Sequence, residues 1–214
     1  MTTERIRSGF LKVAGYFVPL IQSVPAWTGL MTLPFASYLI LVFSNSPINI
    51  SRVFRDFFAP FLILEKILII MGLFILIYSV IYLVLKRKVG LVTSGPYRLV
   101  RHPQYLGIIL LTLGLTSWSV WILNNTFGIG FLSPSQTIGV WFIELCAYVL
   151  LAYVEERHLS RNHVESFENY KFQVPFLIPF LKINREGLGI MASILILAFL
   201  LFGLLEISRI SPIL

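Results

Sequence analysis

The sequence predicts an all-α integral membrane protein with about five transmembrane helices, a helical hairpin and a cytosolic amphipathic segment. Hydrophobic residues make up 57% of the 214 residues and charged residues only 13%, whereas soluble domains are about 25% charged. The mean hydropathy is +0.85. Five apolar stretches are long enough to span a bilayer, which takes roughly 20 residues per helix. These observations exclude a disordered chain and argue against a soluble globular domain.

The five predicted spans follow one another along the chain. Their approximate bounds are Ala26–Ser44, Pro60–Leu85, Pro103–Leu123, Gln136–Glu156 and Leu188–Ser208. Before them, Phe10–Val24 is apolar but carries Lys12 and Pro19. We expect an interfacial or re-entrant helix there, with a sixth span as the alternative. We expect no signal peptide, because no small-residue cleavage site follows the charged start.

Lysine and arginine are distributed unevenly between the two sides of the five spans. With a cytosolic N-terminus, thirteen lie in inner segments and three, Arg52, Arg55 and Arg209, lie in outer segments. This bias predicts that the N-terminus is cytosolic. The formal charge of +7 then reflects cytosolic loops, so we expect membrane lipids and no nucleic acid as partners. Cys146 is the single cysteine, which excludes an internal disulfide and a cysteine metal site.

The third and fourth spans form a predicted hairpin with an uncharged outer loop. His102 and Glu156 each lie 27 residues from Ile129, near the centre of that loop. Antiparallel helices of equal length would bring both residues to one depth at the cytosolic face. Their neighbours Arg101 and Glu155 would lie there too. We therefore expect the densest polar chemistry of the chain, and the active site, at this face.

The segment before the third span combines turn and anion-binding features. Gly95-Pro96 indicates a turn, and Pro103 suits the first position of a helix, which needs no N–H. His102 would occupy the cap region, beside unpaired N–H groups that favour an anion. Gly107 would let a ligand approach the helix backbone. The alternative for such residues is lipid binding, interfacial anchoring or helix packing.

Two carboxylates, Glu155 and Glu156, are expected at the C-terminal end of the fourth helix. The helix macrodipole disfavours acids there, so the pair suggests a use such as binding a cation or a ribose diol. Only one can point squarely into a site, because consecutive residues lie about 100° apart. A solvated helix end is the alternative. The aromatic stretch Ser160–Lys182 follows, and we expect it to lie on the bilayer and cover the pocket.

The two polar blocks combine into a longer motif. The first block reads Gly95, Tyr97, Arg101, His102, Pro103, Tyr105 and Gly107. The second block reads Glu155, Glu156, Leu159, Tyr170, Val174 and Pro175. Together, over about residues 90–182, they resemble the isoprenylcysteine carboxyl methyltransferase family and its phospholipid methyltransferase relatives. One departure is His163-Val164, where the family usually has Phe-Gly.

The resemblance implies an S-adenosylmethionine-dependent methyltransferase whose cofactor enters from the cytosol and whose lipophilic or prenylated substrate enters from the bilayer. The implied cofactor-binding residues are Tyr97, Arg101, His102, Pro103, Tyr105, Gly107, Glu155 and Glu156. No metal is implied. The acceptor could be a prenylcysteine carboxylate, a phospholipid amine or a thiol. For a carboxylate or phosphate head we expect catalytic contacts from Arg157 or Arg161, because arginine offers a planar fork.

We expect N-terminal membrane helices at 1–85, a cofactor-binding core at 86–187 and a C-terminal helix at 188–214.

Two other functions stay open at this point. A sterol-type reductase using NADPH would need extra basic residues, which the run at 86–88 could supply. A transporter or scaffold would use the intramembrane acids Glu65, Glu144 and Glu206, because such acids are costly and usually functional.

Overall fold

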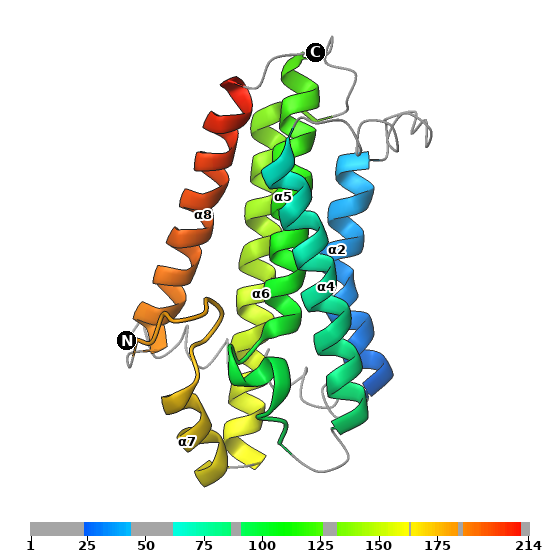
Figure 1. Cartoon of the computed structure of the whole chain (residues 1–214). Coiled ribbons are helices and arrows are strands. Elements are labelled where there is room, and N and C mark those ends of the chain that lie inside the picture. Colours follow the sequence, from blue (N-terminus) through cyan, green and yellow to red (C-terminus); the bar gives the residue numbers. More distant parts are fainter. Residues whose placement is uncertain are drawn as a thin grey trace, which may run out of the picture.

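Figure 1 shows a computed structural model of the chain. The structure describes residues 24–43, 62–86, 91–125, 132–162, 164–183 and 186–210. The expected interfacial helix, apart from its last residue, lies outside these ranges. The described part is a bundle whose long helices alternate in direction along the chain, and these residues contain no strand.

Five long helices form the described bundle. They are α2 (Val24–Phe43), α4 (Ile63–Lys86), α5 (Pro103–Asn125), α6 (Pro134–Asn162) and α8 (Glu186–Ile210). Two shorter helices, η2 (Gly95–Arg98) and α7 (Val164–Gln173), lie at the end of the bundle where α5 begins. Helices α4, α5, α6 and α8 are long and apolar enough to cross a membrane, and α2 contributes a shorter apolar stretch, Gly29–Val42. The prediction of an all-α membrane protein is confirmed.

The helix boundaries agree closely with the predicted spans, with one exception. Helix α6 continues to Asn162, six residues beyond the predicted end at Glu156. An apolar window stops where the bilayer stops, whereas good helix formers such as Glu, Arg and Leu extend the helix into the polar phase. The argument from the helix macrodipole was therefore wrong, because this effect falls off within the last turn and both glutamates lie before that turn.

Helix α5 is the centre of the bundle. It buries 16 of its 23 residues, and α4, α6 and α8 all pack against it. Two tyrosines join α2 to the bundle. The hydroxyl of Tyr38 lies 2.8 Å from the Thr116 hydroxyl of α5, and Tyr148 of α6 donates a 2.9 Å hydrogen bond to the Met31 carbonyl. Helix α2 is thus bonded to both helices of the hairpin, α5 and α6.

Helix α4 turns its polar and small residues inward. Its buried residues are Glu65, Lys66, Gly72 and Ser79, while most of its isoleucine, leucine and phenylalanine side chains are exposed. Ser117 of α5 donates a 2.9 Å hydrogen bond to Glu65. Apolar residues outside and small or polar residues at the helix contact are typical of a helix that faces lipid.

Two glycines allow α4 and α5 to cross closely. A Cβ on Gly72 would lie 2.5 Å from the backbone nitrogen of Leu111, and a Cβ on Gly107 would lie 2.6 Å from that of Leu76. Backbone atoms cannot move aside as the end of a flexible side chain can, so neither position has room for a Cβ and both require glycine. Gly107 therefore faces α4, and this contact replaces the expectation that it opens the helix backbone to a ligand.

The close crossing predicts that Gly72→Ala destabilises the protein by about 1–3 kcal/mol, because the added methyl group overpacks the contact. Thermal and denaturant unfolding in detergent would measure the loss. Gly203→Ala is the matched control, because nothing lies within 4 Å of a Cβ at Gly203 in the described structure. Equal stability of the two variants would contradict the glycine crossing.

Candidate active site

The site is organised around the carboxylate of Glu156 on α6. Its Oε1 atom lies 3.0 Å from Nε of Arg101 and 3.0 Å from Nε2 of His102. Both partners immediately precede α5, which begins at Pro103. Glu156 and His102 are each only 2% exposed. The equal spacing of the two residues from the hairpin loop therefore correctly predicted that α5 and α6 bring these charges together.

His102 lies between two carboxylates. Its Nδ1 atom is 3.6 Å from Oε2 of Glu155, and its Nε2 atom bonds Glu156. Burial alone would lower the pKa of His102, but the hydrogen bonds and charges of the two glutamates outweigh it and raise the pKa to about 9. His102 is therefore a cation at neutral pH, and its Nε2–H donates to Glu156.

Two aromatic rings contact His102, one from α5 and one from the turn after α7. Its ring stacks on Tyr105 with centroids 5.5 Å apart, and it meets the edge of Phe176 at 5.4 Å. Tyr105 in turn donates a 3.0 Å hydrogen bond to Oε2 of Glu155. Both glutamates thus face this cluster, one on each side of His102, although consecutive helix positions predicted that only one would.

Arg101 connects the cluster to α7 and to the turn that follows it. Its backbone N–H donates to the Pro175 carbonyl at 3.0 Å, and its guanidinium donates to the Lys171 carbonyl at 3.3 Å. The guanidinium carbon also lies 5.5 Å from the centre of the Phe176 ring. One residue therefore contacts Glu156 on α6, α7 and the turn after α7.

Tyr97 and Tyr170 form a second connection between these segments. The Tyr170 hydroxyl donates a 2.6 Å hydrogen bond to the Tyr97 carbonyl. The Tyr97 side chain is buried and its hydroxyl points to the Ser79 carbonyl of α4, at 3.5 Å. Burial raises the pKa of both phenols above their ordinary value, so both stay neutral and serve as hydrogen-bond donors.

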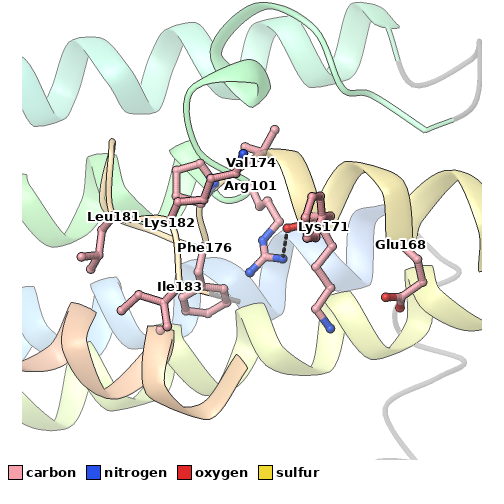
Figure 2. Close-up of a pocket in the computed structure, with 11 residues that line it drawn as sticks. Arg101, Glu168, Lys171, Val174, Phe176, Leu181, Lys182 and Ile183 are labelled. Atoms are coloured by element: carbon pink, nitrogen blue, oxygen red, sulfur yellow. Dashed lines mark hydrogen bonds between the residues drawn. The ribbon is translucent and has the colours of Figure 1, made fainter. Parts of the chain in front are cut away.

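A cavity of about 390 Å³ opens beside Arg101. It is bounded by α7, by the turn that follows α7 and by Gly189 near the beginning of α8. Figure 2 shows the guanidinium of Arg101 pointing to the Lys171 carbonyl, and Glu168 and Lys171 projecting from one side of α7. The turn brings Phe176 and Lys182 to the same cavity.

The predicted site residues are divided between this cavity and the packing behind it. Arg101 alone among them lines the cavity. The lining does not include the others, which are Tyr97, His102, Pro103, Tyr105, Gly107, Glu155 and Glu156. On the last turns of α6, Arg157 lies 5.9 Å from the Tyr153 ring centre and Arg161 is exposed. Neither reaches the cavity.

Sequence reasoning missed Glu168, Lys171 and Lys182 as cavity residues. It counted Lys171 and Lys182 only among the thirteen inner lysines and arginines that indicate how the spans are oriented. The signal that could have found them is their position inside the aromatic stretch that was expected to cover the pocket. Their orientation, however, depends on how α7 docks on Arg101, and no short-range pattern encodes that docking.

Three buried polar atoms of the cluster make no hydrogen bond within the described part of the chain. They are Nδ1 of His102, Nε of Arg101 and Oε2 of Glu156. Two of them nevertheless face carboxylates, because Nε of Arg101 lies 3.0 Å from Oε1 of Glu156 and Nδ1 of His102 lies 3.6 Å from Oε2 of Glu155. Ion pairing within the cluster therefore occupies both donors.

Comparison with known proteins supports the resemblance drawn from the motifs. Residues 58–127 match the isoprenylcysteine carboxyl methyltransferase (ICMT) family, and this stretch includes Arg101 and His102. A methanethiol S-methyltransferase of Crocosphaera subtropica (strain ATCC 51142 / BH68) is 34% identical over 92 residues. That match covers 42% of this chain and 29% of the relative. No solved structure matches the chain.

The charge of His102 predicts that stability falls as the pH rises. Its pKa is raised from 6.5 to about 9 in the folded protein. The resulting stabilisation, on the order of 3 kcal/mol, is fully present below pH 6.5 and is lost as the pH rises through 9. The midpoint of thermal unfolding in detergent should therefore drop over this range in the wild type and drop less in His102→Gln. Equal pH slopes would contradict a charged His102.

Proposed function

We propose, from its resemblance to the isoprenylcysteine carboxyl methyltransferase family, that this chain is an integral-membrane methyltransferase that uses S-adenosylmethionine. The observation that carries the proposal is the position of Arg101. It lies within the residues that match the family, lines the cavity and is held by Glu156. A fixed guanidinium in a cavity is suited to hold the carboxylate of an amino-acid ligand.

The residues around the cavity fit the polar groups of this cofactor. Arg101 would hold its carboxylate and Glu168 its ammonium group. The aromatic rings of Phe172 and Phe176, which also line the cavity, suit a sulfonium cation and an adenine ring. A volume of about 390 Å³ lies within the range of roughly 300–1,000 Å³ that small-molecule sites occupy.

S-adenosylmethionine would supply an electrophilic methyl group, because transfer converts its sulfonium into a neutral thioether. The protein would then contribute mainly orientation and the exclusion of water. Glu156 and His102 would act as positioning residues that fix Arg101 from behind. The contacts of Arg101 with Lys171 and Pro175 would keep α7 closed over the cavity.

A lipophilic acceptor would reach the cavity from the bilayer. Gly189 lies on the cavity wall within α8, a helix long and apolar enough to cross the membrane. Leu188 and Met191 beside it are exposed. The distribution of lysine and arginine favours the cytosolic face for this end of the bundle. The name of the Crocosphaera relative adds a thiol to the acceptors worth testing.

The proposal predicts that Arg101→Gln weakens S-adenosylmethionine binding by about ten- to a hundredfold, the usual effect of losing a charge-assisted hydrogen bond. Glu156→Gln should weaken binding less, because it releases Arg101 without removing it. Titration calorimetry on purified protein would measure both. Arg161→Gln is the matched control, because this exposed arginine lies outside the cavity.

The wild-type titration also separates this proposal from a reductase. Binding of S-adenosylmethionine and not of NADPH supports the methyltransferase. Binding of NADPH alone, or unchanged S-adenosylmethionine affinity in Arg101→Gln, would contradict it.

A further inference from the structure

One phenylalanine lies almost entirely outside the bundle. Phe180, in the turn between α7 and α8, is 96% exposed, the largest exposed fraction among the large hydrophobic side chains of the described residues. A single exposed apolar residue needs no explanation by itself. For Phe180, however, both the conformation of the backbone and the position of the turn beside the membrane point to a partner for the ring.

The backbone conformation of Phe180 is unusual for a bulky residue. Phe180 is the third residue of a turn in which the Leu181 N–H donates to the Ile178 carbonyl at 3.2 Å, and its φ is +68°. Proline at the second position, here Pro179, and a positive φ at the third are typical of a type II turn, whose third residue is usually glycine or asparagine. Phenylalanine is strained in such a conformation, so the bundle alone would favour a smaller residue here.

The turn lies beside the part of α8 that can cross the membrane. This part begins at Gly187, and a Cβ on Gly189 would lie 3.7 Å from Cβ of Ile183 in the turn. Ile183 is therefore level with a residue about 3 Å inside the span. Three residues reach at most about 10 Å, so Phe180 lies close to the interfacial layer, which is about 5–8 Å thick on each side of the hydrocarbon core. Figure 1 shows the turn beside the beginning of α8, with α7 farther out.

Helix α7 itself directs its aromatic residues toward the protein. Phe167 and Tyr170 are buried and pack against each other, while Glu165 and Asn169 are exposed. An amphipathic helix that lies on a bilayer has the opposite orientation, with its aromatic side toward lipid. The membrane contact that the sequence suggested for the whole aromatic stretch is therefore left to the turn after α7.

We propose that the turn at residues 174–183 is a membrane-contacting element, in which the Phe180 ring inserts into the interfacial layer at this end of the bundle. Phe176, Leu181 and Ile183 of the same turn line the cavity. The bilayer thus holds one wall of the cavity in place and offsets the strain at Phe180. This role does not depend on which ligand the cavity binds, so it stands or falls separately from the proposed methyltransferase function.

Site-directed spin labelling measures the insertion directly. Cys146 is the single cysteine, so in the Cys146→Ser background Phe180→Cys carries the only label, in nanodiscs of phosphatidylcholine. Oxygen concentrates in the bilayer, whereas a nickel chelate stays in water. The ratio of collision rates with oxygen and with the chelate should be about threefold or more above that of Glu165→Cys on the exposed side of α7. Phe199→Cys, at a side chain of α8 that is 80% exposed, is the lipid reference.

Two results of this measurement would overturn the proposal. A ratio equal to that of the label at Glu165→Cys would place Phe180 in water. Low collision rates with both reagents would place it in a contact with protein, such as a second copy of this chain.

Hydrogen–deuterium exchange in the same nanodiscs tests whether the contact holds the cavity wall. Phe180→Asn removes the ring but suits a positive φ, so the turn can still fold. We expect the amides of residues 174–183 to exchange about three- to tenfold faster in this variant, because the wall opens more easily without the contact. Relief of backbone strain alone would slow the exchange, so the two effects have opposite signs.

Two further variants control the exchange experiment. Phe180→Trp should keep the wild-type rate, because tryptophan is well suited to the membrane interface. Phe199→Ala removes another exposed ring, from α8, and should leave the turn unchanged. Unchanged or slower exchange of the turn in Phe180→Asn, or equally fast exchange in Phe199→Ala, would refute the claim that the bilayer holds this wall through Phe180.

Discussion

The carboxylate of Glu156 holds together segments that are far apart in the sequence. One of its oxygens contacts Arg101 and His102 at 3.0 Å each, which joins α6 to the beginning of α5. Arg101 then extends the connection to Lys171 and Pro175. Breaking a buried pair from one side typically costs about 3–5 kcal/mol, because the remaining charge loses its partner. The walls of the cavity therefore depend on this carboxylate.

Much of this arrangement follows from the sequence alone. Apolar length predicts the five long helices, because a bilayer requires spans of similar length. Symmetric spacing about one short loop predicts that His102 and Glu156 meet, since two antiparallel helices rise equally per residue. Both arguments use only chain geometry and the membrane, and neither depends on how individual side chains pack.

The rest depends on tertiary contacts that no local pattern encodes. The sequence suggested that Gly107 lets a ligand approach the backbone of the third span. In the structure the backbone of α4 lies against Gly107, so Gly107 is a helix-packing residue. Helix geometry predicted that only one of Glu155 and Glu156 faces the site, yet His102 lies between them and contacts both. The sequence indicates only that Lys171 and Lys182 belong to the basic cytosolic segments, whereas in the structure α7 and the turn after it bring them to the cavity. In each case the partner is far away in the chain.

A double-mutant cycle on the free energy of unfolding tests the central role of Glu156 most directly. It compares Arg101→Gln, Glu156→Gln and the double variant with the wild type in detergent. The account predicts a coupling energy of about 1–3 kcal/mol between the two positions, as for other contacting charges. Additive losses, equal to within about 0.5 kcal/mol, would contradict the claim that this pair holds the site together.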